Sequence, residues 1–164
     1  MRFKAFYNLL IKMIFHYYLE ADIEVESKEE VGDCLNGELS HILGEYKSLR
    51  EVMTNHGLAA LGDSFVNFLY SLALSIRHGE PKGGKVTGRT LSESLTKADL
   101  RRYLPSRIDR HARADAAEAL IVYAWIKGVF SIRKAVETLS THEDPCEGFA
   151  ELLIKARKCL ENSS

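Results

Sequence analysis

The chain has 164 residues, of which 46% are hydrophobic and 27% charged, and its formal net charge is −1. This length favours a single domain with its own core, and the composition is that of a globular protein rather than a disordered or fibrous one. The near-zero net charge excludes the overall basic excess of many nucleic-acid-binding proteins, so such binding would need a local basic cluster.

The cysteines and the N-terminus both bear on where the protein works. Cys34, Cys146 and Cys159 are odd in number and lack a C-x-x-C spacing. They argue against a disulfide framework or a zinc site and favour a reducing, cytoplasmic setting. At the N-terminus we expect a packed helix rather than a signal peptide, because Lys12 and His16 interrupt the hydrophobic run. The apolar residues at helical spacing are Phe3, Phe6, Leu10, Ile14 and Tyr17.

An acidic stretch separates this region from the next predicted helix. Residues 22–33 (DIEVESKEEVGD) are strongly acidic, which predicts a surface segment or a short helix. From about Glu38, apolar residues recur at helical intervals and predict a helix that stops near Gly57. Gly37 marks the change from the acidic stretch to the helix.

Residues 58–76 are the next predicted helix, and Asp63 is their only ionisable side chain. An apolar stretch of this length can in principle span a bilayer. An acidic residue inside a span is costly, and the glycine, serine and asparagine residues here weaken the hydropathy. We therefore predict no membrane partner and a buried helix at a core or a subunit interface.

A glycine-rich loop, HGEPKGGKVTG, follows at residues 78–88. It fits the first part of a P-loop, but Val86 stands where a magnesium-binding Ser or Thr is needed, and the loop follows a helix instead of a strand. We therefore reject nucleotide triphosphate binding. Lys82, Lys85 and Arg89 are interpreted as a mobile basic patch, with a solvated surface loop as the alternative.

The rest of the chain is also predicted to be helical. Short helical pieces at residues 90–95 and 97–104 precede a break at Pro105. A long helix begins near Asp109, a suitable N-cap, and ends at Gly128. Two more helices are expected at residues 131–139 and 146–160. Because strand alternation is nowhere sustained, the predicted fold class is all-α.

The long helix carries an unusual carboxylate. Residues 116–126 are apolar on every side except at Glu118, so the helix is expected to be buried. A buried carboxylate is costly unless it is paired or bound to a metal ion. Asp115 projects from the same face three residues earlier. Together with Asp63 these carboxylates would repel one another unless a cation lies between them, and such hard oxygen ligands suit Mg²⁺ or Mn²⁺.

An alternative gives the same residues structural roles only. Asp63 would then cap its helix or interact with the helix dipole, and Asp115 would pair with Arg113 or His111. The basic side chains around the acidic pair would either contact phosphates or form a solvated rim. These basic side chains are Arg101, Arg102, Arg107, Arg110, His111 and Arg113.

Two motifs, in order and at the right separation, resemble the ribonuclease III family. Residues 61–64, Leu-Gly-Asp-Ser, followed by an apolar helix, resemble the family signature L-E-x-L-G-D-[AS]. Residues 115–120, DAAEAL, resemble its second acidic motif, D-x-x-E-A-L. The resemblance covers about residues 38–130. The segment LPSRIDRHARADAAEALIVYAW looks most similar to short archaeal members of the family.

The resemblance implies an all-α domain that forms a homodimer with a valley for double-stranded RNA. It implies a metal-dependent endoribonuclease for RNA processing, which leaves 5′-phosphates and 3′-hydroxyls. Asp63, Asp115 and Glu118 match positions that hold Mg²⁺, with Mn²⁺ as a substitute, and Glu118 is the catalytically critical one. We expect one domain over residues 1–164 without a separate double-stranded-RNA-binding domain, as in mini-ribonuclease III proteins. The expected RNA contacts are Lys82, Lys85, Arg89, Arg107, Arg110 and Arg113.

One signature position departs from the pattern. The glutamate four residues before Asp63 is replaced by Ala59, and the other signature glutamate position falls at His56. Metal affinity or a second metal is therefore in question, unless Glu45, Glu51 or a water supplies the missing oxygen. This leaves a second function open, a catalytically impaired relative that binds double-stranded RNA or a protein partner through the same valley. A third is an all-α dimerisation domain whose carboxylates only cap and pair.

Overall fold

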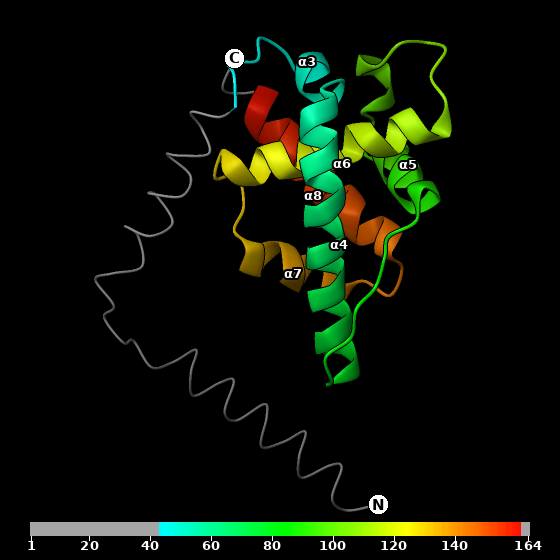
Figure 1. Ribbon diagram of the computed structural model, residues 1–164, viewed down its shortest axis with the longest axis vertical. Coiled ribbons are helices and arrows are strands. Elements are labelled where there is room, and N and C mark those ends of the chain that lie inside the picture. Colours follow the sequence, from blue (N-terminus) through cyan, green and yellow to red (C-terminus); the bar gives the residue numbers. More distant parts are fainter. Residues whose placement is uncertain (1–42, 162–164) are drawn as a thin grey trace, which may run out of the picture. The chain divides into compact units, whose positions relative to one another are not determined.

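The computed structural model describes residues 43–161, drawn in colour in Figure 1. Contacts divide the chain into two units, Met1–Leu35 and Asn36–Ser164, and the described residues all belong to the second. The predicted N-terminal helix, the acidic segment 22–33 and Cys34 lie outside the described residues. A single domain for the whole chain therefore stays a prediction.

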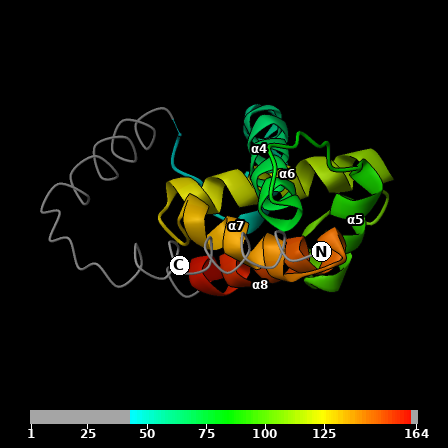
Figure 2. The same cartoon turned by 90° about the horizontal axis from the view of Figure 1, so that it is seen from below.

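Helices account for all the regular structure in the described residues, which contain no strand, and this confirms the predicted all-α class. The elements are α3 (Leu49–Met53), α4 (His56–His78), α5 (Gly88–Lys97), the 3-10 helix η1 (Arg101–Tyr103), α6 (Arg110–Ile126), α7 (Ile132–Thr141) and α8 (Pro145–Glu161). The central helix is α6, which contacts α3, α4, α5 and α8. Figure 2 shows α6 between α4 and α8.

Local capping explains where the later helices begin and end. The Asp109 carboxylate accepts a hydrogen bond from the Ala112 N–H at 2.8 Å and starts α6, as predicted. The Ser131 hydroxyl accepts one from the Lys134 N–H at 3.2 Å and starts α7. Gly128 follows α6 with a φ of 72°, a left-handed conformation that glycine adopts without steric cost. The sequence therefore predicted these boundaries to within a residue or two.

The single helix predicted over residues 38–57 is wrong within the described part of the chain. Residues 43–48 are not helical, α3 has only five residues, and α4 already starts at His56. Two caps cause the break, because the Ser48 hydroxyl accepts a backbone N–H of α3 and the Asn55 side-chain carbonyl accepts one of α4. The apolar spacing runs across both caps and so gave no sign of them.

Gly62 allows α4 and α6 to cross at very short range. A Cβ atom placed on Gly62 would lie 2.9 Å from the Glu118 Cβ and would collide with the Glu118 backbone carbonyl. The same crossing is lined by the stacked rings of Phe65 and Trp125, with centroids 4.6 Å apart. Because Asp63 follows Gly62 directly, the crossing brings it beside the acidic face of α6.

Helix α4 is long and apolar enough, by length and composition alone, to cross a membrane. One of its faces is buried through Val66, Leu69 and Ala73, and the helix contacts both α6 and α7. The sequence predicted a buried helix at a core or a subunit interface. Only one face of α4 is buried within the described residues, so burial of the remainder at a subunit interface stays a prediction. The same helix carries the three large exposed apolar side chains of the described residues, Leu61, Phe68 and Ile76. In Figure 1 the C-terminal end of α4 extends beyond the neighbouring helices.

Candidate functional site

The crossing of α4 and α6 brings the three predicted carboxylates within electrostatic reach of one another. Burial raises the pKa of Glu118 to about 7, and repulsion from Asp63 and Asp115 adds to the increase. The Lys85 ammonium opposes it by favouring the charged form of Glu118. A carboxylate held half-buried between two others is strained in the absence of a cation, and such groups are typical of functional sites.

The carboxylates at the crossing are the kind of ligand that a hydrated divalent metal ion takes. Within residues 43–161, no three His, Cys, Asp or Glu side chains are grouped closely enough to hold a metal ion on their own. Mg²⁺ usually binds through one or two carboxylates and keeps several waters. The repulsion acting on Glu118 is what such a cation would relieve. The donor set therefore fits a hydrated ion held by some of the carboxylates, and the assignment of Asp63, Asp115 and Glu118 as a complete ligand set stays a prediction.

The structural roles considered for the aspartates do not occur in the described part of the chain. Asp63 lies in the second turn of α4, whose N-cap is Asn55. Asp115 forms no ion pair with Arg113 or His111 among residues 43–161. Neither aspartate is therefore accounted for by capping or by pairing with these neighbours.

The Asp63 carboxylate is oriented by Asn67, one helical turn later. The Asn67 amide nitrogen donates to Asp63 Oδ1 at 3.1 Å and to the Asp63 backbone carbonyl at 2.7 Å. The Asn67 Oδ1 atom accepts a hydrogen bond from the Val86 N–H at 2.8 Å. Asn67 thus connects the glycine-rich loop to an acidic residue of the site, a role that the sequence analysis missed.

Three polar side chains hold the loop against α4, and we call them the polar ladder: Asn67, Ser71 and Ser75. They are spaced four residues apart, so they lie along one face of the helix. Each accepts a hydrogen bond from a backbone N–H of the loop, and the donating loop residues are two positions apart. The pairs are Val86 with Asn67 at 2.8 Å, Gly84 with Ser71 at 3.0 Å, and Lys82 with Ser75 at 2.9 Å. The interpretation of this segment as a mobile patch was therefore wrong, because α4 anchors its backbone.

Close packing at Gly84 adds to this anchoring. A Cβ atom at Gly84 would collide with the Leu74 side chain and lie 3.1 Å from the Tyr70 ring. The polar residues of α4 entered the sequence analysis only as a reduction in hydropathy. Their regular spacing of four on an otherwise apolar helix was the signal that could have predicted a bound segment.

A pocket of about 210 Å³ lies where the signature glutamate is missing. Ala59 and His56 line it from α4, and Asp115 lines it from α6. The remaining lining residues are Met53, Thr54, Asn55, Ile108 and Ala112. A longer side chain at position 59 would therefore have space to extend towards Asp115.

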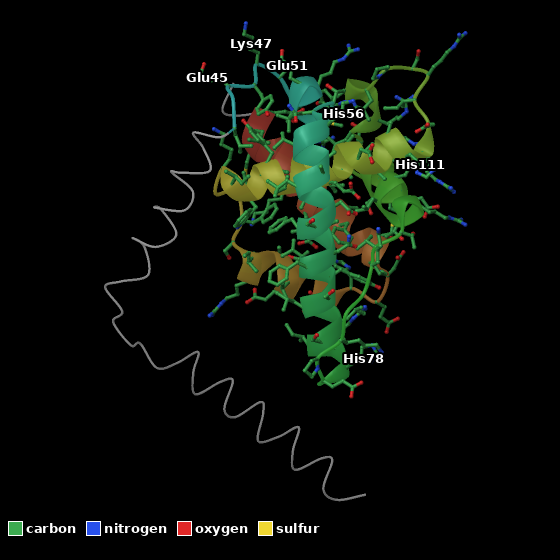
Figure 3. All side chains as sticks on the ribbon, in the orientation of Figure 1. Glu45, Lys47, Glu51, His56, His78 and His111 are labelled. Carbon is green, nitrogen blue, oxygen red and sulfur yellow. The ribbon has the colours of Figure 1, made fainter. Side chains whose placement is uncertain are left out.

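The proposed substitutes for the missing glutamate do not occupy this pocket. Glu51 accepts a hydrogen bond from the Lys47 N–H at 2.8 Å, near the start of α3. Glu45 and Glu51 are exposed, and neither lines the pocket or is among the charges that act on Glu118. Figure 3 shows both glutamates beside Lys47, with His56 at the start of α4. The fourth carboxylate is thus not supplied by these residues.

The predicted RNA-contacting cations differ in their surroundings. Arg107 is exposed in the turn before α6, and Arg110 is exposed as the first residue of the helix. Arg113 is partly buried, and its Nε atom has no hydrogen-bond partner. The Arg89 guanidinium pairs with Glu93 at 2.8 Å on the exposed face of α5. A role of these side chains in binding RNA stays a prediction.

Two further arginines from the predicted basic rim have structural partners. Arg101 donates to the backbone carbonyls of Pro105 and Ser106 at 2.8 and 2.6 Å and so supports the turn before α6. Arg102 pairs with Asp99 at 3.0 Å. The basic rim is therefore divided into side chains that stabilise the fold and exposed ones at the start of α6.

A family model described as Ribonuclease III matches residues 56–152, more than half of the chain. The chain belongs to the ribonuclease III family. The match contains Asp63, Asp115 and Glu118 and runs from α4 into α8, so it ends later than the resemblance seen in the motifs alone. A comparison with curated proteins gave no match. A ribonuclease III domain indicates an endoribonuclease that acts on RNA, and the family generally depends on divalent metal ions and acts on double-stranded RNA.

Proposed function

We propose that this ribonuclease III protein is a Mg²⁺-dependent endoribonuclease that hydrolyses phosphodiesters of double-stranded or structured RNA. The observation that carries the proposal is the acidic group at the α4–α6 crossing, where Asp63 and Asp115 help to raise the pKa of Glu118 to about 7. Such repulsion lowers the stability of the folded state without a compensating interaction, which supports a functional role for these carboxylates.

In this proposal Asp63, Asp115 and Glu118 hold the ion, which Mn²⁺ can replace. An ion bound there would supply an activated water and would stabilise the leaving oxygen. Gly62 sets the separation of the two helices, and Asn67 orients the Asp63 carboxylate. The exposed cations near the start of α6 would contact RNA phosphates, an interaction that weakens as salt rises.

The test is cleavage of a long double-stranded RNA by the purified full-length chain in Mg²⁺, in Mn²⁺ and in EDTA. Metal-dependent cutting that leaves 5′-phosphates and 3′-hydroxyls supports the proposal. Salt-sensitive RNA binding without cutting in either metal would instead support the second function, a catalytically impaired relative that binds double-stranded RNA or a partner. Ala59 is the residue that favours this second function.

We further propose that the protein forms a homodimer through the exposed face of α4. Leu61, Phe68 and Ile76 are 45%, 49% and 58% exposed, and their spacing places them along one side of the helix. A row of large exposed apolar side chains on a monomer is typical of an interaction surface. The polar ladder occupies another part of α4 and leaves this row uncovered.

Replacing Phe68 with glutamate is expected to convert the dimer to a monomer, because a charge would be buried in an apolar interface. Light scattering after gel filtration should give twice the chain mass of 18.5 kDa for the wild type and the single mass for Phe68→Glu. Arg133→Glu, an exposed site on α7, is the control and should stay dimeric. A dimeric mass for both proteins would place the interface elsewhere, and a wild type with the single-chain mass would contradict the homodimer.

Replacing Ala59 with glutamate is expected to strengthen metal binding, because the pocket would place a further carboxylate beside Asp115. Without metal the added charge should lower the melting temperature at pH 8 by a few degrees, which corresponds to roughly 1 kcal/mol. Mn²⁺ should then raise the melting temperature of Ala59→Glu more than that of the wild type. Ala59→Gln, similar in size but uncharged, should show neither effect. Identical Mn²⁺ responses of the two variants would exclude position 59 from the metal site.

A further inference from the structure

The loop residue Lys85 is held at a defined place by its two neighbours. The N–H groups of Gly84 and Val86 bond to Ser71 and Asn67 of the polar ladder, at 3.0 and 2.8 Å. Lys85 therefore lies between two anchored peptide units on the surface of α4. An exposed lysine in a free loop would have no such restriction on its backbone.

The same hydrogen bonds place Lys85 near the acidic residues. Asn67 binds the backbone next to Lys85 through its Oδ1 atom, and through its amide nitrogen it donates to Asp63 Oδ1 at 3.1 Å. The loop next to Lys85 and the Asp63 carboxylate are thus bonded to the two polar atoms of one side-chain amide.

The other cations of this segment have different surroundings. The Lys82 ammonium lies 3.5 Å from His78 Nε2, and Arg89 pairs with Glu93. The backbone of Lys82 bonds to Ser75, two helical turns away from Asn67, and so has no such link to Asp63. In the described part of the chain Lys85 has no ion pair or hydrogen bond through its ammonium. The three cations that the sequence analysis grouped into one basic patch are therefore not equivalent.

We propose that Lys85 is a charge-balancing residue of the metal site, a cation whose backbone the polar ladder holds near the Asp63 carboxylate. This inference rests on the proposed function, because it assumes that Asp63, Asp115 and Glu118 bind a divalent ion. Three carboxylates and one ammonium leave a net charge of −2, which one divalent ion neutralises. A glutamate at position 59 without Lys85 would give −4 and favour two ions. Each subunit is therefore expected to bind one metal ion.

The test is titration of the full-length chain with Mn²⁺ in the absence of RNA, by calorimetry or by the electron paramagnetic resonance of free Mn²⁺. The wild type should bind one ion per chain. Lys85→Met keeps most of the side-chain stem and removes the charge, so it should bind Mn²⁺ more tightly. The expected decrease in Kd is about three- to sixfold, the effect of removing one unit charge from the neighbourhood of a divalent ion in a water-like medium.

Two variants serve as controls for this titration. Lys85→Arg keeps the charge and should keep the wild-type affinity for Mn²⁺. Lys82→Met removes a charge from the same loop and should leave the Mn²⁺ affinity unchanged. A merely structural role for Lys85 would not make metal binding tighter when the charge is removed, so the direction of the change decides between the two roles.

The outcomes separate this inference from the proposed function. Lys85→Met could instead bind Mn²⁺ as the wild type does or more weakly, and lose as much RNA affinity in EDTA as Lys82→Met. Lys85 would then be a phosphate contact, and this inference alone would be overturned. Two ions per wild-type chain would overturn the charge balance, again without affecting the proposed function. No Mn²⁺ binding by the wild type would overturn both.

Discussion

Glu118→Gln should abolish metal-dependent RNA cleavage while making the metal-free protein more stable. The substitution keeps the size of the side chain and removes its negative charge. We expect the cleavage rate to fall by at least roughly 10²- to 10³-fold, the loss seen when one charge-stabilising group is removed from an active site. The rate of cutting of double-stranded RNA in saturating Mg²⁺ measures this effect.

The stabilisation has a definite pH dependence. The pKa of Glu118 is raised from an ordinary value of 4.5 to about 7 in the folded chain. Between these values the folded state binds more protons than the unfolded state, so the stability of the wild type falls as pH rises from 4.5 to 7. Glutamine does not titrate. The variant should therefore match the wild type below pH 4.5 and exceed it above pH 7.

The expected gain above pH 7 is on the order of 1 to 2 kcal/mol, after allowance for solvent screening of a half-buried group. Urea unfolding in EDTA at pH 5 and pH 8 measures it. The control is Glu80→Gln, an exposed carboxylate at the start of the loop, which should change neither stability nor cleavage. A Glu118→Gln variant that cleaves RNA at the wild-type rate would transfer the catalytic role to another group.

Gly62→Ala should destabilise the fold by about 3 kcal/mol, at the upper end of the usual cost of overpacking. The added Cβ would collide with the Glu118 backbone carbonyl, which cannot move aside as the end of a flexible side chain can. In an exposed helix the same substitution would stabilise by about 1 kcal/mol, so a large loss isolates the effect of the crossing. Urea unfolding measures the change.

The same substitution should reduce cleavage even at temperatures where the variant is folded. Separating α4 from α6 would move Asp63 away from Glu118, because Asp63 lies on α4 and Glu118 lies on α6. Gly83→Ala is the matched control, because a Cβ at Gly83 meets nothing within 4 Å. It should keep both stability and activity. If Gly62→Ala were as stable as the wild type, the helices could separate without cost and the close crossing would not define the site.

Part of this structure could be predicted from the sequence because it depends on interactions between residues that are close in the sequence. Asp109 and Ser131 cap helices by bonding to N–H groups three residues later, so both starts could be predicted. The all-apolar surroundings of Glu118 predicted a buried helix for the same reason. Where two local signals competed the prediction was wrong. The caps at Ser48 and Asn55 divided a segment whose apolar period indicated one helix.

The sequence also determined the family, through two acidic motifs whose residue types and order do not depend on how the helices pack. Only the tertiary structure decided the rest. The polar ladder joins residues as far apart as Asn67 and Val86, and the pocket beside Ala59 is closed by Asp115 from another helix. Gly62 matters only because α6 passes against it. These features depend on which surfaces meet, and helical periodicity specifies the face a helix buries without specifying its partner.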